Sequence, residues 1–261
     1  MIGYVYNKAM EEQLRDLGVR EGDILLVHSS IKALGLKDLK IESLIKSIEN
    51  VLGEKGTLLM PTLSYKSVDG NNNDTFSVKD TPSDVGALSE CFRKMDGVVR
   101  SLHPTHSVCA KGRFAKELLE NHHLDQTPCG PNSPFRLVNE MGGHILFLGC
   151  GLNPNTSMHG VEELVEPDYL YGEMLQYKLF NVNREKSYKY YKTHGFKNTI
   201  QCYDRIEALL EEGTELKKGK VFEAECYLIN AKAMWKKAIN ILREDEHYFV
   251  DVKKESVKKT L

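Results

Sequence analysis

Three short segments near the start of the chain constrain its fold more than any other part of the sequence. Residues 24–28 (ILLVH) form a continuous apolar run between turn residues. Residues 56–65 (GTLLMPTLSY) predict a second strand, in which Pro61 marks where it stops being an interior one. Between them, residues 41–52 place apolar side chains at helical spacing, and Gly53 follows as a stop. A strand, a helix and a second strand in this order are typical of a parallel or mixed sheet with helices packed on it. We therefore expect an α/β fold.

Other segments are less regular. Asn7 is a suitable cap for a first helix, with Gly18 as its stop. Residues 66–84 have no periodicity and predict a long loop, which inside a compact domain is usually disordered or part of a site. Residues 100–112 and 127–137 contain too many prolines and glycines for plain strands or helices.

The second half of the chain continues the alternation of strands and helices. Residues 142–149 (GGHILFLG) predict another buried strand, and residues 224–245 predict a strand that leads into a helix. No internal repeat or linker divides the sequence. We therefore predict a single compact domain over residues 1–261, with a mixed or parallel sheet flanked by helices and a small elaboration at 170–220.

The composition excludes several classes of protein. The chain is 41% hydrophobic and 28% charged, and no apolar run approaches the roughly 20 residues of a membrane helix. Its six cysteines form no Cys-x-x-Cys pair, so neither a structural zinc site nor a disulfide framework is indicated. The net charge is −2 and the basic residues gather only in the tail at 253–259, which argues against nucleic-acid binding. We expect a cytoplasmic protein without a nucleic-acid or membrane partner.

The most informative turn lies at residues 147–163 (FLGCGLNPNTSMHGVEE), where an apolar strand ends and a helix follows at once. Residues 155–157 (Asn, Thr, Ser) each offer an oxygen that can cap this helix. His159 then falls in the first turn, where free backbone N–H groups and the helix dipole disfavour positive charge, so we expect a neutral imidazole. Glu162 lies three residues further on, on the same helix face, and predicts a carboxylate that orients a general base.

The same residues also fit simpler and different sites. His159 and Glu162 are equally consistent with a capping or core histidine beside a solvated glutamate. With His28, His103 and His106 they form a set of ordinary zinc ligands, which keeps a metal-dependent hydrolase as an alternative. The spacings match no known metal signature, however, and we expect no metal.

A cysteine nucleophile is a further alternative, because Cys109, Cys129 and Cys150 all lie beside turns rich in proline and glycine. Free cysteines are usually small buried side chains, and three of them in three segments indicate no single nucleophile. The sequence also lacks a Gly-x-Gly-x-x-Gly turn and a Gly-Lys-Ser/Thr loop, so a dinucleotide-binding or P-loop enzyme is not supported.

Six stretches of the sequence together resemble the signature stretches of the aminoglycoside 3-N-acetyltransferase family, in order and approximate spacing over almost the whole chain. They are residues 27–35 (VHSSIKALG), 60–65 (MPTLSY), 81–93 (TPSDVGALSECFR), 100–112 (RSLHPTHSVCAKG), 127–137 (TPCGPNSPFRL) and 147–163. The resemblance implies an N-acetyltransferase that uses acetyl-CoA as donor, with the α/β fold of that family and antibiotic resistance as the associated role.

The resemblance also implies roles for particular residues. By similarity, the segment at 27–35 lies along the pantetheine arm of CoA, and His159 is the general base with Glu162 as its partner. The residues implied to contact CoA are Ser29, Ser30, Lys32, Leu34, Gly35 and Ser107. A homodimer is a further expectation from the family.

The acceptor is the less defined substrate. An aminosugar amine is mostly ammonium at neutral pH and needs a base before it attacks a thioester. Acidic side chains near the base would attract such a cation, and we expect Tyr65, Asp74, Glu163 and Glu166 to contact it. The acceptor is then an amine of an aminoglycoside or a related aminosugar. A CoA-binding protein without catalytic activity remains the other alternative.

Overall fold

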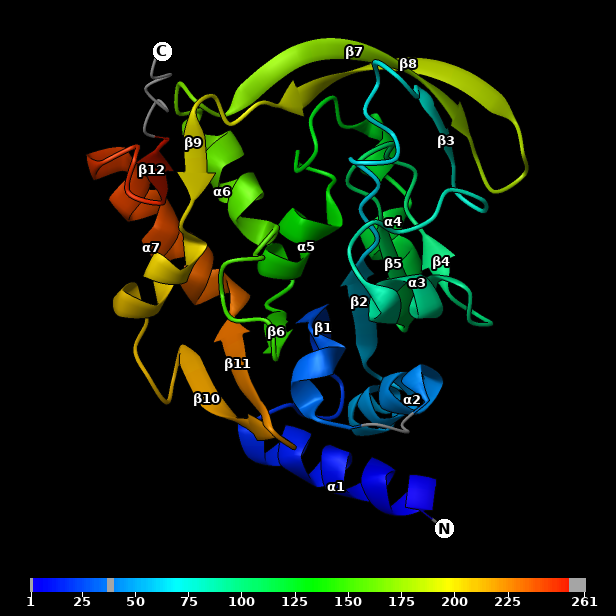
Figure 1. Cartoon of the computed structure of the whole chain (residues 1–261), viewed down its shortest axis with the longest axis vertical. Helices are drawn as coiled ribbons and strands as arrows, with labels where there is room; N and C mark the ends of the chain where they lie inside the picture. The colour runs from blue at the N-terminus through cyan, green and yellow to red at the C-terminus, as the bar shows by residue number, and fades with distance from the viewer. Residues whose placement is uncertain (1, 37–39, 254–261) are drawn as a thin grey trace, which may run out of the picture.

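The structure is a computed structural model that describes residues 2–36 and 40–253, with side chains from residue 6 onward. Its centre is a seven-stranded sheet in the order β10-β11-β6-β1-β2-β5-β4 (Figure 1). The strands β1 (Ile24–Ser29), β2 (Thr57–Pro61) and β6 (His144–Leu148) are parallel, with β1 between the other two. The predicted strand–helix–strand unit and the buried strand at 144–148 are confirmed.

The outer strands of this sheet run antiparallel to their neighbours, so the sheet is mixed. On one side of the parallel centre, β5 pairs with β2 and β4 pairs with β5; on the other side, β11 pairs with β6 and β10 pairs with β11. These strands are β4 (Val99–Arg100), β5 (Val108–Gly112), β10 (Leu216–Val221) and β11 (Ala224–Asn230).

Helices cover both faces of the sheet. The apolar run of β1 is continuous because its side chains pack against helices on both faces. Leu25 and Val27 pack into one hydrophobic cluster, whereas Ile24 and Leu26 pack into another. The first cluster holds α1 (Ile2–Leu17), α2 (Ile41–Leu52) and α3 (Ala87–Arg93). The second holds α4 (Ala115–Leu119), α5 (Pro134–Glu140), α6 (Ser157–Val165) and α7 (Ala231–Glu244). The α/β fold with a sheet flanked by helices is therefore as predicted.

A second, three-stranded sheet arches over the end of the molecule that lies away from α1 (Figure 1). Its order is β3-β7-β8, with β3 parallel to β7 and with β7 and β8 forming an antiparallel hairpin. These strands are β3 (Thr75–Ser77), β7 (Tyr171–Phe180) and β8 (Lys186–His194). Most of this sheet falls within the elaboration expected at 170–220, but the division of the chain into domains stays a prediction.

A strand pair and three short 3-10 helices complete the described structure. The strands β9 and β12 pair with each other apart from both larger sheets. The remaining elements are β9 (Thr199–Gln201), β12 (Val250–Val252), η1 (Ile31–Leu34), η2 (His122–Leu124) and η3 (Tyr203–Leu209).

Four local predictions were wrong. The first helix begins at Ile2, not after Asn7. The expected loop at 66–84 contains β3, which is stabilised by pairing with the distant β7. The two stretches rich in proline and glycine contain β4, β5 and α5, and α5 begins with a proline that suits the first position of a helix.

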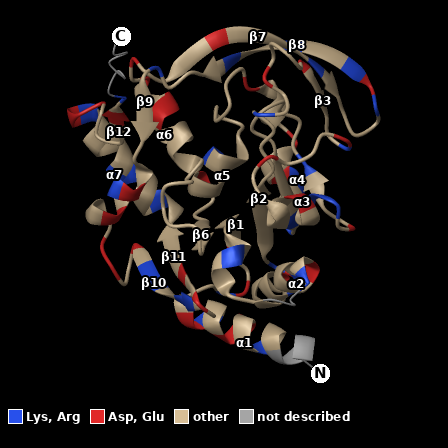
Figure 2. Cartoon of the chain, viewed as in Figure 1, with Lys and Arg blue, Asp and Glu red and all other residues tan. Residues whose placement is uncertain are grey.

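Charged residues lie on the outer surfaces of the helices and on the arching sheet, whereas the three parallel central strands carry none (Figure 2). Among the described residues, no helix is long and apolar enough to cross a membrane. Most of the Lys-rich tail at 253–259 lies outside the described residues.

Candidate functional site

A cavity of about 870 Å³ lies between the C-terminal ends of β1 and β2 and the arching sheet. In sheets with parallel strands, this is the edge at which ligands usually bind. Its walls come from the end of β1, the segment after β2, the turn before α6, and the inner faces of β7 and β8. A cavity of this size lies within the roughly 300–1,000 Å³ that is typical of small-molecule sites.

His159 lies on the wall of this cavity, in the first turn of α6 as predicted. The helix can pack closely on α7 because residue 160 is a glycine: a Cβ at Gly160 would lie 2.5 Å from the ring of Trp235. The predicted side-chain cap was wrong. Thr156 is the N-cap but has helical torsion angles (φ −62°, ψ −24°) and makes no side-chain capping bond, and the amide of Asn155 donates to the sulfur of Met234.

Glu162 is completely buried behind His159 and is held by three side chains. Tyr169 Oη donates to Glu162 Oε1 over 2.9 Å, and Tyr203 Oη donates to Glu162 Oε2 over 2.8 Å. His159 Nδ1 lies 3.3 Å from Glu162 Oε2 and 2.9 Å from Tyr203 Oη. A buried carboxylate needs such partners, because an unpaired charge in the interior is costly.

These contacts determine how His159 is protonated. Burial, and next the charge of Glu162, raise the pKa values of Tyr169 and Tyr203, so both phenols keep their protons and donate them to the carboxylate. The Tyr203 oxygen then accepts a hydrogen bond from the neighbouring ring nitrogen, which places the proton of a neutral His159 on Nδ1. Nε2 is thereby left with a lone pair, which is the arrangement that a general base requires.

A second histidine on the same wall has a carboxylate partner of its own. His194 Nε2 lies 2.8 Å from Glu163 Oε1, and the side chain of His194 is 2% exposed. Glu163 also accepts hydrogen bonds from Thr127 Oγ1 and from the backbone N–H of Cys129. Burial lowers the pKa of His194, although the bond to Glu163 opposes this shift.

The ring of His106 lies close to both of these rings at the cavity wall. Its ring centroid lies 6.0 Å from that of His159 and 5.5 Å from that of His194, and its Nδ1 lies 2.8 Å from Thr105 Oγ1. Burial holds the pKa of His106 well below its usual range and lowers that of His28 to about 3, so both rings are neutral. His103 is fully buried and accepts backbone N–H bonds from Thr105 and His106.

The segment predicted to bind CoA begins at this cavity and then leaves it. Ser29 lines the cavity, and the backbone N–H of Ser30 donates to the carbonyl of Leu148 at the end of β6. Lys32 and Gly35 are exposed on η1 and just after it, and Gly35 has a left-handed backbone (φ 71°). Leu34, also predicted to contact CoA, is 1% exposed and packs into the hydrophobic cluster of α1 and α2.

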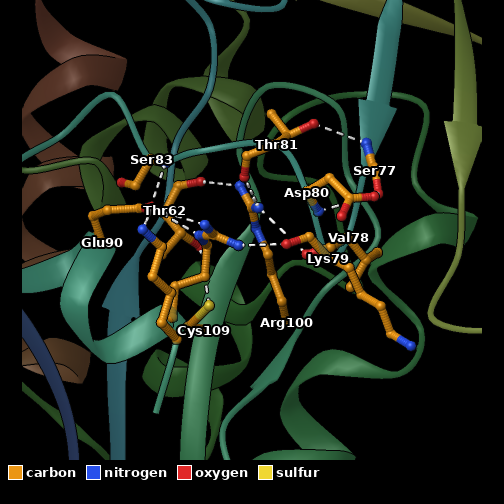
Figure 3. A network of polar contacts seen from close by, with 12 residues as sticks. Thr62, Ser77, Val78, Lys79, Asp80, Thr81, Ser83, Glu90, Arg100 and Cys109 are labelled. Carbon is orange, nitrogen blue, oxygen red and sulfur yellow. Dashed lines mark hydrogen bonds and ion pairs between the residues drawn. The ribbon is translucent and has the colours of Figure 1, made fainter.

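Ser107, the last residue predicted to contact CoA, lies outside the cavity lining and contacts Arg100. Figure 3 shows the polar network around Arg100. Ser107 Oγ accepts from Arg100 Nε over 2.9 Å and donates to the carbonyl of Thr62 over 2.9 Å. Arg100 also donates to the carbonyls of Thr62, Val78 and Thr81. This network joins β4 to the segments that follow β2 and β3 and to the residue before β5.

The residues predicted to contact the acceptor do not all reach the cavity. Tyr65 lines it, and Glu163 lies directly behind His194. Asp74 and Glu166 are exposed and are not part of its lining. Glu166 instead ends α6 with a left-handed backbone (φ 54°).

Two other carboxylates line the cavity where the sequence did not suggest them. Asp69 accepts backbone N–H bonds from Asn71, Asn72 and Asn73, and a side-chain bond from Asn72 lowers its pKa to about 2. Glu173 lies on β7 and is exposed. The lining contains no lysine and no arginine among the described residues, so its charge is negative.

The cysteines do not support a thiol nucleophile. All six are free, and Cys109 and Cys129 are buried. Burial raises the pKa of Cys109 to about 11 and that of Cys150 to about 12, and holds that of Cys129 well above its usual value. These three side chains are therefore thiols rather than reactive thiolates.

Tyr169, Tyr203 and His194 were missed by the sequence analysis. Nothing near them in the sequence points to His159, because Tyr203 is 44 residues away and His194 is 35 residues away from it. Only the fold brings them together.

Comparison with known proteins identifies what this arrangement is similar to. The family model described as aminoglycoside 3-N-acetyltransferase matches residues 26–243. An aminoglycoside N(3)-acetyltransferase III from a Salmonella species is 27% identical over 249 residues, which cover 86% of this chain and 87% of the relative. An aminoglycoside N(3)-acetyltransferase IV, also from a Salmonella species, is 35% identical over 64% of this chain and 62% of the relative.

Solved structures show the same fold. A histidine-to-alanine mutant of aminoglycoside acetyltransferase AAC(3)-IVa in complex with a gentamicin is 28% identical, with a TM-score of 0.77 over 93% of this chain and 90% of the other. AAC-IIIb in a binary complex with CoASH is 21% identical, with a TM-score of 0.78 over 91% of this chain and 96% of the other. The second likeness concerns the fold alone.

Proposed function

Because the chain belongs to the aminoglycoside 3-N-acetyltransferase family, we propose that His159 is the general base in a direct transfer of acetyl to an amine. The chain is an acetyl-CoA-dependent N-acetyltransferase, as its resemblance to the family implied, and acetyl-CoA is its acetyl donor. The metal-dependent hydrolase and the CoA-binding protein without catalytic activity are not favoured, because the named relatives are acetyltransferases.

One observation carries the assignment of the base. Tyr203 and Glu162 hold the Nδ1 side of His159, and the ring lies on the wall of the cavity. His159 Nε2 is therefore available to take a proton from a substrate. Glu162 supports this step, because its buried charge stabilises the imidazolium that forms.

The proposed reaction balances without a covalent enzyme intermediate. The acceptor reacts as the neutral amine, after its ammonium form has lost one proton to solvent. His159 removes a second proton from the nitrogen as this nitrogen attacks the acetyl carbonyl. The new C–N bond forms and the C–S bond of acetyl-CoA breaks. The imidazolium then returns the proton to the CoA sulfur, so the products are the N-acetylated amine and free CoA thiol.

The acceptor follows from the charge of the cavity. Asp69 and Glu173 line it and, among the described residues, no lysine or arginine does, which favours a ligand with several ammonium groups. Tyr65 and Phe196 add aromatic faces on which a sugar ring or a cation can pack. We infer an aminoglycoside, or an aminosugar related to one, with Glu173 and Asp69 in the roles that the sequence suggested for Asp74 and Glu166.

The donor needs a path into the same cavity, and the end of β1 is the best candidate. Ser29 lines the cavity, and the next residue is bonded to the end of β6, so the segment after β1 lies beside the turn that precedes His159. A pantetheine arm along this segment would bring the thioester to the base. Ser30, Lys32 and Gly35 remain the proposed contacts, whereas the buried Leu34 supports the segment from beneath.

A panel of amines tests the proposal. The protein is mixed with acetyl-CoA and, in separate reactions, with gentamicin, other aminoglycosides, glucosamine and a simple alkylamine, and release of free thiol is followed. We expect turnover with polycationic aminosugars, and mass spectrometry should show one acetyl group on each product. Turnover with the alkylamine alone would contradict the assigned acceptor class.

Two further properties belong to this proposal. A cytoplasmic location is supported by the six free cysteines, since thiols persist in a reducing compartment. A homodimer is what the family resemblance suggested, and light scattering during size-exclusion chromatography tests it.

A further inference from the structure

Three histidines from three distant segments meet on the wall of the cavity. They are His106 from the segment before β5, His159 from α6 and His194 from the end of β8. Each ring offers one nitrogen, and these three nitrogens lie within 4.8 Å of one another. The rings meet edge to face, with interplanar angles of 64° to 75°, so their nitrogens can converge on a point rather than stack.

In each of these rings, one nitrogen is in contact with a polar partner. His106 Nδ1 is paired with Thr105 Oγ1, His159 Nδ1 with Tyr203 and Glu162, and His194 Nε2 with Glu163 Oε1. Ligand histidines in metal sites are usually oriented in this way, most often by a carboxylate or a hydroxyl group. These contacts leave Nε2 of His106, Nε2 of His159 and Nδ1 of His194 for a shared ligand.

A buried atom without a partner points to such a ligand independently. The side chain of His194 is 2% exposed, and its Nδ1 has no hydrogen-bond partner among the described residues. Leaving a buried ring nitrogen unpaired costs free energy, so a native structure needs a reason for it. An ion bound between the three rings would supply the missing partner.

We propose that His106, His159 and His194 bind a divalent transition-metal ion such as Zn²⁺, with the fourth ligand position open to the cavity. Three neutral imidazoles with an open position are an ordinary ligand set for zinc. Zinc–nitrogen bonds of about 2.1 Å in a tetrahedron place the nitrogens roughly 3.4 Å apart, so nitrogens that lie within 4.8 Å of one another need to close by at most about 1.4 Å. No metal was expected from the sequence because the spacings of His28, His103, His106 and His159 match no known metal signature, and His194 was not among the residues considered.

Metal binding at His159 would inhibit acetyl transfer. This effect rests on the proposed function of His159 as the general base. An ion on His159 Nε2 occupies the lone pair that the proposed base uses for proton transfer. The bound metal therefore inhibits the enzyme, and the site is a point of inhibition by metal rather than a hydrolytic centre.

Binding is tested without any substrate. The protein is stripped with a chelator and titrated with Co²⁺, which gives strong visible absorption only in a site with few ligands and low symmetry. We expect one cobalt ion per chain, loss of the absorption in His194→Gln, and displacement of the cobalt by Zn²⁺. In Glu163→Gln, the affinity for cobalt should fall about 10- to 100-fold, because His194 loses the carboxylate that orients it.

The matched control is His247→Gln, which changes a half-exposed histidine in the exposed group Asp168, Glu246 and His247. This variant should keep the full cobalt absorption. Absence of the absorption in the wild type, or its persistence in a folded His194→Gln variant, would overturn the site.

Inhibition is tested separately, by following the acetylated acceptor with mass spectrometry because free CoA thiol itself binds zinc. We expect Zn²⁺ to slow acetyl transfer by the wild type, and a chelator to restore it. Glu163→Gln should need about 10- to 100-fold more zinc for the same fractional inhibition. Cobalt binding at the three histidines with acetyl transfer indifferent to zinc would overturn the inhibitory role while leaving the metal site intact.

Discussion

The two walls of the cavity differ in how firmly their polar groups are held. On the α6 wall, Glu162 is completely buried and accepts hydrogen bonds from two buried tyrosines while it contacts His159. On the acidic wall, which includes β7, Glu173 is exposed, and Asp69 is bonded mainly to its own loop. One wall is a closed network and the other is an open, acidic surface.

This difference separates two tasks. Proton transfer requires one ring nitrogen to be placed within hydrogen-bonding distance of the reacting amine, so the base needs a rigid set of partners. Attraction of a polycation acts over a longer distance and does not depend on one geometry. We therefore expect substitutions on the α6 wall to affect kcat, and substitutions on the acidic wall to affect KM.

The largest effect within this comparison is expected for Glu162→Gln. The amide keeps the shape of the side chain but removes the charge that stabilises the imidazolium, so kcat should fall roughly 10²- to 10³-fold. Glu166→Gln, at the exposed end of the same helix, is the control and should leave kcat unchanged. Thiol release under saturating substrates measures both, with thermal unfolding to show that each variant is folded.

The two walls differ in how deeply their polar groups are buried. The effect of burial on a titratable group can be measured through the pH dependence of stability, with His122 as the example. This ring is fully buried and is not part of the cavity lining; His122 Nδ1 is paired with Ser101 Oγ, and Nε2 donates to the carbonyl of Pro128. Burial lowers its pKa to about 3, with Lys189 and His123 as the charged groups nearby.

The sign of the effect follows from linkage. The unfolded chain takes up a proton on His122 below about pH 6.5, whereas the folded chain does not until about pH 3. Stability from this group is therefore lost as the pH falls below 6.5, by about 2 kcal/mol at pH 5, or roughly 30-fold in the unfolding equilibrium. Urea unfolding of His122→Asn should lose this part of the pH dependence, whereas His123→Asn, at an exposed neighbour, should keep it.

A smaller effect on kcat is expected for Tyr203→Phe. The phenol that bridges Glu162 and His159 is lost, but the ring and the carboxylate stay, so kcat should fall about 10-fold. Tyr188→Phe on the exposed face of β8 provides the control. Equal kcat in both variants would show that the bridge does not orient the base.

The smallest effect is expected on the acidic wall. Glu173→Gln removes an exposed charge from the cavity, so KM for a polycationic acceptor should rise about 3- to 5-fold with kcat unchanged. The same measurement on Glu166→Gln and Asp74→Asn distinguishes the cavity seen in the structure from the patch expected from the sequence. If KM rose more in either of these variants than in Glu173→Gln, the acceptor would bind to the patch expected from the sequence and not to the cavity wall.

The sequence predicted the central sheet well because its strands are apolar on both faces and its helices have continuous apolar stripes. Both signals are local to each element, as in β1 and α2. The arching sheet was harder to predict, because β7 is exposed over much of its length and β3 has only three residues. Such strands depend on their partners rather than on their own periodicity.

The same distinction holds for the site. His159 and Glu162 are three residues apart on one helix, so their contact could be predicted from spacing. Tyr203, Tyr169 and His194 come from later segments, and a tyrosine or histidine in a polar stretch carries no local sign of its partner. Leu34 and Ser107 have buried side chains, and their contact with CoA, which rests on the family resemblance alone, stays a prediction.

The proposed mechanism depends most on His159 as the general base. The variant His159→Gln tests this assignment most directly. In His159→Gln we predict that kcat for acetyl transfer to an aminoglycoside falls about 10²- to 10⁴-fold. The affinity for CoA, measured by calorimetry on the same preparation, should stay within about twofold of the wild type. A folded variant that binds CoA and still transfers acetyl at the wild-type rate would contradict the assignment of His159 as the base.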